Sequence, residues 1–223
     1  WIGVPDLPRY GLVGRDELVT DLVNRLSTGT AVSLSAEGKG GVGKTALAVA
    51  LAHRRDLLAH FRDGVLWASL GPKSEPFTAL ARWATAVGLD PVVYAGPYEL
   101  KQAIRDAIGR RVLLLVIDDI WQQEHAELLL CGGPFCAHVL TTRDLVIAHA
   151  FAQGSEVITV PELEADPAFE LLQTIAPKAC AADPELAHVL ALAVGGLPLA
   201  IELLGGYLPS RQAPFVAPSR GLL

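Results

Sequence analysis

A glycine-rich stretch of eight residues has the composition and spacing of a phosphate-binding loop. Its letters, GKGGVGKT, match the pattern G-x-x-x-x-G-K-[ST] at every position from Gly38 to Thr45. In this pattern the backbone N–H groups point at phosphate oxygens, Lys44 neutralises the β/γ charge, and the Thr45 hydroxyl coordinates Mg²⁺. A merely flexible glycine turn is the alternative. The predicted nucleotide contacts are Gly40, Gly41, Val42, Gly43, Lys44, Thr45 and the backbone N–H of Ala46.

Two adjacent carboxylates follow the apolar run of residues 112–117. Neighbouring acids repel each other and are costly at an apolar boundary unless a cation offsets their charge. A magnesium–nucleotide complex supplies that cation, so we assign Asp118 to the magnesium shell. Asp119 is the candidate to orient or deprotonate the attacking water. The alternative for Asp119 is that it caps the following turn.

An arginine stands just after a second apolar run, residues 138–141. From the carboxyl end of a strand the guanidinium of Arg143 could reach a γ-phosphate and so distinguish ATP from ADP. The alternative is an ion pair with Asp144 or Asp119. Trp121 and Trp67 are predicted to pack against the flanks of the sheet rather than to stack on a base.

The elements that must position these residues form an alternating pattern. The apolar runs predicted as strands are residues 31–36, 65–70, 112–117, 138–141 and 156–160. The segments between them predicted as helices are residues 44–60, 76–87, 98–108 and 124–130. Near-continuous apolar strands separated by helices indicate a parallel sheet that is covered on both faces. The predicted fold class is therefore α/β, with the sheet flanked by helices.

After residue 160 the strand signal ends. Residues 161–208 predict a small all-helical domain of one helix followed by one or two more, and residues 209–223, with three prolines, predict a linker. We therefore expect an α/β nucleotide-binding domain at residues 1–160 followed by the helical domain.

Composition excludes several classes of protein. Of 223 residues, 51% are hydrophobic and 19% charged, which rules out disorder for most of the chain. The formal charge of −6 argues against a nucleic-acid partner, and no apolar stretch is long enough to span a membrane. Three cysteines without a paired spacing suggest thiols in a reducing cytoplasm. The chain has no methionine and no secretory signal, so we expect a piece of a longer protein.

The motifs occur in the order found in one known family. The segments VGRDE (13–17), GKGGVGKT (38–45), LLVIDDIW (114–121), VLTTRD (139–144) and GGLPLA (195–200) carry the similarity. The chain resembles the NB-ARC nucleotide-binding module of STAND-class signalling ATPases, which include apoptotic protease-activating factors, plant disease-resistance proteins and bacterial homologues. The resemblance implies a P-loop NTPase sheet with a helical domain.

The resemblance also implies roles that the residues alone do not. Leu197 and Pro198 are expected to contact adenine, and Val13 and Arg15 to hold the base and sugar; alone, GGLPLA reads as an interrupted apolar helix. The cofactors implied are ADP or ATP with Mg²⁺. A winged-helix domain is expected after the linker, with effector and repeat domains outside the chain and self-oligomerisation in the ATP state.

Three functions are compatible with these motifs. The first is a molecular switch in which slow ATP hydrolysis controls conformation. The second is a P-loop phosphotransferase acting on a small molecule, which usually carries an arginine-rich lid; residues 161–207 contain no arginine. The third is a module that holds nucleotide without productive hydrolysis. We favour the switch.

Overall fold

The computed structural model describes residues 2–29, 31–35, 40–152 and 156–208. The chain divides into two compact units, Trp1–Pro161 and Glu162–Leu223, which are described one at a time. The predicted linker at residues 209–223 lies outside the described residues.

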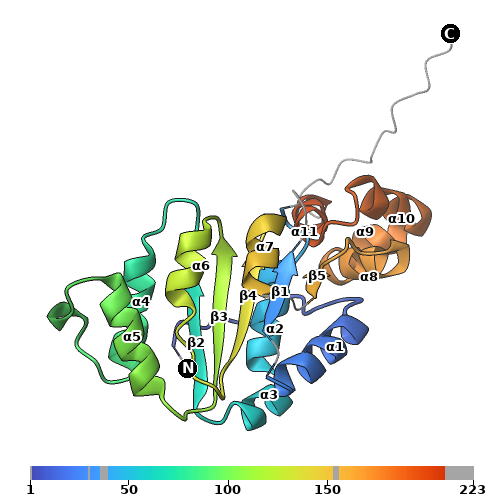
Figure 1. Ribbon diagram of the computed structural model, residues 1–223. Coiled ribbons are helices and arrows are strands. Elements are labelled where there is room, and N and C mark those ends of the chain that lie inside the picture. The colour runs from blue at the N-terminus through green and yellow to red at the C-terminus, as the bar shows by residue number, and fades with distance from the viewer. Residues whose placement is uncertain (1, 30, 36–39, 153–155, 209–223) are drawn as a thin grey trace. The chain divides into compact units, whose positions relative to one another are not determined.

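The first unit is built on a five-stranded sheet in the order β2-β3-β4-β1-β5, with every neighbouring pair parallel (Figure 1). The strands are β1 (Val32–Ser35), β2 (Gly64–Ser69), β3 (Leu113–Ile120), β4 (Ala137–Thr142) and β5 (Val157–Thr159). This confirms the predicted α/β class. The strand bounds differ by one to three residues. The largest difference is at β3, which continues through both acidic residues instead of ending at residue 117.

Helices pack against both faces of the sheet. One group, in which the helices contact one another, comprises α1 (Asp16–Ser27), α2 (Lys44–His53) and α3 (Arg55–His60). The other group comprises α4 (Pro76–Ala86), α5 (Pro97–Ile108), α6 (Gln123–Leu129) and α7 (Leu145–Ala152), with a 3₁₀ turn η1 (Pro91–Val93).

Two helix predictions were wrong. The single helix expected at residues 44–60 is two helices, because Arg54 between them is extended (ψ 127°). Helix α7 was not predicted. Its sequence, LVIAHAFA, is apolar almost all round, so it has no amphipathic period by which a helix is recognised.

Side-chain alternation along β3 decides which residues face the nucleotide loop. Leu113, Leu115 and Ile117 belong to the buried cluster formed with α4, α5, α6 and α7. Successive side chains of a strand point to opposite faces, so Asp118 shares the opposite face with Leu114 and Val116. Helix α2 contacts β3 on that opposite face, and α2 begins directly after the glycine-rich loop.

The second unit is helical throughout residues 165–208 apart from its turns. Its helices are α8 (Ala165–Ile175), α9 (Pro177–Ala182), α10 (Pro184–Ala193) and α11 (Pro198–Tyr207), more than the two or three expected. Proline is the first residue of α9, α10 and α11, where its missing N–H costs no hydrogen bond. Across the ranges that the structure describes, no helix is long and apolar enough to cross a membrane.

Candidate functional site

The carboxyl ends of three neighbouring strands bring the predicted site residues together. The glycine-rich loop follows β1, Asp118 and Asp119 lie near the end of β3, and Arg143 follows β4. In the sheet β4 pairs with both β1 and β3, so the three strand ends are adjacent. Ligands of open α/β sheets bind at such an edge. These predicted phosphate, metal and catalytic residues are thus in one place.

The described part of the loop has the backbone that phosphate binding requires. Gly41 and Gly43 both have left-handed backbone (φ 81° and 101°), a conformation that favours glycine. Val42 between them is buried and anchors the loop in the core. Gly43 is the N-cap of α2, so the helix adds its positive dipole end to the loop. Gly38 and Lys39 lie outside the described residues.

Lys44, the first residue of α2, is buried, with 9% of its surface exposed to solvent. Burial lowers the pKa of its ammonium, and the positive charge of Arg143 lowers it further, while Asp119 and Asp118 act in the opposite direction. Two cations therefore share the neighbourhood of the loop. A polyanion such as a nucleotide phosphate chain would relieve both the burial cost and the repulsion.

Asp118 is almost fully buried and accepts three side-chain hydrogen bonds. The hydroxyls of Thr45 and Thr141 donate to Oδ1 at 2.8 and 2.7 Å, and the Ser69 hydroxyl donates to Oδ2 at 3.1 Å. Burial nevertheless raises the pKa of this carboxyl, with the three hydroxyls opposing the rise and Asp119 adding to it. Ionisation of this carboxyl therefore carries an energetic cost, which a cation would offset.

The donor set fits Mg²⁺. The two predicted magnesium ligands, Thr45 and Asp118, are in direct hydrogen-bond contact, so one ion could reach both oxygens. Thr45 is exposed to solvent at the start of α2, which leaves that side accessible. Hydroxyl and carboxylate oxygens, with waters and phosphate, are the ligands that Mg²⁺ prefers.

Asp119 lies at a β-bulge. The register between β3 and β4 shifts between Ile117 and Ile120, so one extra residue is accommodated in β3. Within this bulge Asp119 has φ 56°, the one positive φ of a non-glycine residue in the described ranges. Its backbone N–H donates to the Thr141 hydroxyl at 2.9 Å. Aspartate adopts left-handed backbone more readily than most residues, and a catalytic role for Asp119 stays a prediction.

Arg143 lies directly over the glycine-rich loop. Its Nη1 lies so close to Gly40 that a Cβ built on this glycine would stand 2.9 Å away. The guanidinium carbon also lies 5.3 Å from the centre of the Trp121 ring. Asp144 instead caps α7 by accepting from the N–H of Val146 at 2.7 Å. The expectation that Trp121 packs on the sheet flank was wrong, because its indole contacts Arg143 and is 43% exposed.

Comparison with protein families agrees with this geometry. The model of the NB-ARC domain matches residues 15–181, which include the loop, both acids of β3 and Arg143. The chain belongs to the NB-ARC family. It is thus an NB-ARC nucleotide-binding module, as the motif order predicted.

Relatives come from bacteria and plants. The regulatory protein AfsR of Streptomyces griseus is 31% identical over 94% of this chain, and the probable disease resistance RPP8-like protein 2 of Arabidopsis thaliana is 29% identical over 90%. The chain spans only 21% and 23% of those two proteins.

Solved structures share the fold. A STAND protein with a tetratricopeptide repeat sensor from Pyrococcus horikoshii has a TM-score of 0.60 at 18% identity, covering 91% of this chain and 31% of that one. The ORC2 protein of Aeropyrum pernix, solved as ADPNP–ADP complexes, has a TM-score of 0.58 at 17% identity, covering 88% and 62%.

Arg15 is the first residue of the NB-ARC match. This residue is the N-cap of α1, is buried, and its Nη2 donates to the backbone carbonyl of Pro161. Val13 is half-buried and precedes Gly14, whose φ of 64° makes the turn into α1. The structure therefore gives Arg15 a structural contact, and its expected role at the base and sugar stays a prediction.

The GLPL segment of this NB-ARC chain interrupts the helical unit. Gly195 and Gly196 have φ of 74° and 62° and separate α10 from α11, which begins at Pro198. The carbonyl of Gly196 accepts from the N–H of Leu163 at 2.8 Å. Leu197 and Pro198 are half-buried. The interruption of the apolar helix is thus real, and contact of these two residues with adenine stays a prediction.

Sequence reasoning missed three residues that complete the NB-ARC site. Ser69 and Thr141 are hydrogen-bonded to Asp118, and Trp121 packs on Arg143. Each lies at or just past the carboxyl end of a buried strand. A polar or aromatic residue at that position was the available signal.

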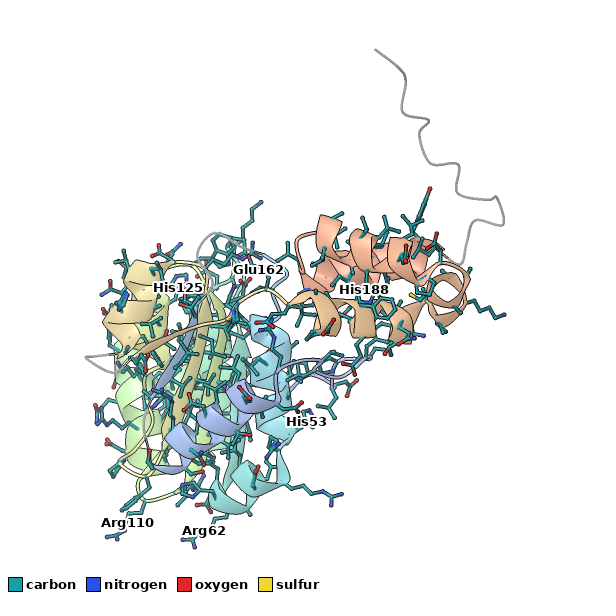
Figure 2. All side chains as sticks on the ribbon, turned by 90° about the vertical axis from the view of Figure 1, so that its right-hand side faces the viewer. His53, Arg62, Arg110, His125, Glu162 and His188 are labelled. Carbon is teal, nitrogen blue, oxygen red and sulfur yellow. The ribbon has the colours of Figure 1, made fainter. Side chains whose placement is uncertain are left out.

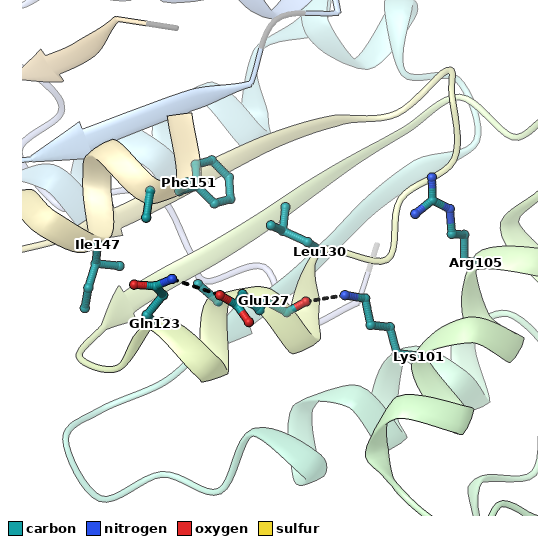
Figure 3. Close-up of a pocket in the computed structure, with 9 residues that line it drawn as sticks. Lys101, Arg105, Gln123, Glu127, Leu130, Ile147 and Phe151 are labelled. Atoms are coloured by element: carbon teal, nitrogen blue, oxygen red, sulfur yellow. Dashed lines mark hydrogen bonds between the residues drawn. The ribbon is translucent and has the colours of Figure 1, made fainter. Parts of the chain in front are cut away.

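A cavity of about 380 Å³ between α5, α6 and α7 has none of the residues predicted to bind nucleotide in its lining (Figure 3). Lys101 donates to the carbonyl of Glu127 at 2.5 Å, and Gln123 donates to its carboxylate at 2.9 Å. Lys101 thereby caps the carboxyl end of α6, a favourable place for a cation. The polar lining of this cavity is thus explained by helix packing.

Proposed function

We propose that the chain is the ATP/ADP-binding switch of a longer STAND protein, which hydrolyses ATP slowly and controls conformation and oligomerisation. The observation that carries the proposal is the contact between Thr45 and Asp118, 2.8 Å apart at the start of α2, with Arg143 over the adjoining loop. Metal ligands, phosphate cradle and a separate cation are the parts that an ATP-responsive site needs.

The proposed phosphate contacts are the backbone N–H groups of residues 40–46 and the ammonium of Lys44. Thr45 and Asp118 would hold Mg²⁺, which supplies positive charge to the phosphate oxygens when bound. Ser69 and Thr141 keep the Asp118 carboxylate in one orientation through their hydroxyls. These hydrogen bonds restrict the carboxylate to one orientation, which would reduce the ordering required when nucleotide and Mg²⁺ bind.

Asp119 is proposed to accept a proton from, or orient, the attacking water. Its backbone is fixed at φ 56° by the bulge and by the hydrogen bond to Thr141. Arg143 is proposed to contact the γ-phosphate, which ATP has and ADP lacks. The described helical unit offers no arginine that could assist turnover, which supports slow hydrolysis.

Leu197 and Pro198 are proposed to contact adenine, with Val13 and Arg15 at the base and sugar. The base is common to ATP and ADP, so these residues would set affinity for both. The chain spans about a fifth of its relatives' length, and we propose effector and sensor domains elsewhere in a longer protein as its partners.

The test is to denature the freshly purified chain and identify the released nucleotide by chromatography, and then to measure turnover with Mg·ATP. Near-stoichiometric ADP with slow, acceptor-independent phosphate release is expected. Acceptor-dependent ADP production would indicate a phosphotransferase instead. Tight binding of both nucleotides without any phosphate release would indicate a binding module only.

A further inference from the structure

We propose that Trp121 is a positioning residue that holds the Arg143 guanidinium over the glycine-rich loop, ready for the γ-phosphate. The proposal rests on the proposed function, since it deepens the role given there to Arg143. Trp121 itself need not touch the nucleotide. Its effect would be selective for the triphosphate, because Arg143 senses the phosphate that ADP lacks.

The pairing of two strand ends brings the residues together. Ile120 of β3 is paired with Thr142 of β4, and the Thr142 hydroxyl donates to the Ile120 carbonyl at 2.8 Å. Trp121 and Arg143 are the next residue on each strand, so they leave the sheet side by side. This connection is buried and fixes the two backbones relative to each other.

The bulge at Asp119 determines which residue of β3 lies next to Arg143. Ile117 is paired with Leu140, so a regular ladder would place Asp119 opposite Thr142 and Ile120 opposite Arg143. Because β3 has one extra residue, Trp121 and not Ile120 lies next to Arg143. An aromatic ring therefore takes the place of an aliphatic side chain there. The bulge in β3 therefore orients Asp119 and also places the Trp121 ring next to Arg143.

Two neighbours lie close to the guanidinium. Its carbon lies 5.3 Å from the Trp121 ring centre, within the range of a cation–π attraction. Its Nη1 lies against Gly40, where a Cβ would be 2.9 Å away. With 43% of its surface exposed, Trp121 is not a core residue, so burial alone does not account for its position.

The contact with the Trp121 ring would counteract an electrostatic repulsion that acts on Arg143. The positive charges of Arg143 and Lys44 repel each other across the loop. In the absence of phosphate this repulsion favours conformations of Arg143 that point away into solvent. A cation–π attraction at a part-exposed site changes such an equilibrium by about two- to fivefold.

A matched pair elsewhere in the same unit provides the control. Arg110 lies over the ring of Phe135, with its guanidinium carbon 5.4 Å from the ring centre, and Phe135 is 47% exposed. Arg110 precedes β3 whereas Trp121 follows it, so the two pairs lie at opposite ends of that strand. Figure 2 shows Arg110 extending outward at the end of the unit.

The experiment measures affinity for Mg·ADP and for a non-hydrolysable Mg·ATP analogue by calorimetry. Trp121→Leu should weaken the analogue by about two- to fivefold and leave ADP unchanged. Trp121→Phe, which keeps a π face, should stay close to wild type. Phe135→Leu should change neither affinity, and in an Arg143→Ala background Trp121→Leu should have no further effect.

Equal weakening of both nucleotides by Trp121→Leu would overturn the proposal, because it would show a general structural role. Wild-type affinities for both nucleotides in Trp121→Leu would overturn it as well. So would a loss of analogue affinity that Trp121→Leu still causes in the Arg143→Ala background. If Arg143→Ala itself weakens ADP and the analogue equally, the sensing function of Arg143 fails and the inference fails with it. A selective Arg143→Ala with a silent Trp121→Leu rejects the inference alone.

Discussion

The α/β unit and the helical unit bury different kinds of residue. Among the described residues, the buried polar and charged side chains all lie in the α/β unit: Arg15, Ser33, Ser35, Lys44, Asp118, Thr141 and Thr142. The buried side chains described in the helical unit are apolar, and its special feature is a backbone turn with positive φ at Gly195 and Gly196.

The two units therefore differ in the kind of free-energy cost that their unusual residues impose on folding. In the α/β unit the cost is electrostatic, because a buried carboxylate and a buried ammonium stand ready for a charged ligand. In the helical unit the cost is steric and conformational, because Gly195 and Gly196 have positive φ and a Cβ on Gly196 would stand 2.3 Å from the Leu163 carbonyl oxygen. Changes of charge should therefore affect chemistry in the first unit, and changes of size should affect folding in the second.

The largest effect is expected from Asp119→Asn. Asparagine tolerates the left-handed backbone but cannot take a proton, so turnover should fall by about 10²–10⁴-fold while nucleotide affinity and stability stay unchanged. Phosphate release under single-turnover conditions measures this. Asp144→Ala, which removes the cap of α7, should show the reverse pattern of lower stability and normal turnover. Unchanged turnover in Asp119→Asn would reject the proposed base.

Lys44→Ala should separate binding from folding. Loss of the ammonium that neutralises the β- and γ-phosphates should weaken nucleotide affinity by at least about 100-fold with the fold intact. Calorimetry measures the affinity and circular dichroism the fold. Lys73→Ala, at an exposed position, is the control for a lost lysine. Near-native affinity would contradict the role of Lys44.

Gly196→Ala tests the steric cost in the helical unit. The new Cβ would stand 2.3 Å from the Leu163 carbonyl oxygen at a residue whose φ is 62°. We expect a loss of about 3 kcal/mol in the stability of that unit. Gly195→Ala has a similar φ of 74° and open space, so it should cost only about 1–2 kcal/mol. Equal losses in denaturant unfolding would mean that the close contact with Leu163 is unimportant.

Asp118→Asn should stabilise the nucleotide-free chain while impairing magnesium-dependent binding. The folded carboxyl has a pKa above its ordinary 3.8, so the folded state binds the proton more tightly and wild-type stability falls as pH rises above 3.8. Asparagine removes this loss and can still accept from Thr45 and Thr141. A gain of about 1–2 kcal/mol at pH 7, measured by urea unfolding, is expected. A less stable variant would contradict this account.

The smallest effect is expected at β1. The hydroxyl of Ser33 is buried without a hydrogen-bond partner in the described structure, so Ser33→Ala should raise stability by about 1 kcal/mol. Thr142 has a buried hydroxyl that does donate, to Ile120 at 2.8 Å, so Thr142→Val should lower it by a similar amount. The same sign for both variants in urea unfolding would show that hydrogen bonding does not decide the cost.

The parallel sheet was predictable because continuous apolar runs alternate with helical segments. The break at Arg54 was not, since no glycine or proline marks it, and α7 was hidden by its uniform apolarity. The bulge in β3 was also hidden, because it depends on the register with β4 rather than on local sequence. Pairing across strands is a tertiary property, which a single sequence does not encode locally.

The residue types of the site were predictable from spacing, but their partners were not. The loop and the acids of β3 follow from a motif whose chemistry fixes each position. The environment of Asp118 depends on Ser69 and Thr141, which are 49 and 23 residues away in the chain. For Trp121 the sequence indicated an apolar ring and gave no sign of Arg143 as its neighbour.

The hydrogen bond from Arg15 to Pro161 closes a loop of the chain, since its ends are separated by 146 positions. The first helix of the α/β unit therefore begins beside the residue with which that unit ends. All five strands lie between these two residues, so a circular permutation that joins residue 161 to residue 15 would keep the strands and omit the segment whose Ile2 bridges Leu66. Such a permuted unit would keep every strand pairing of the sheet while reversing which segment leaves the ribosome first.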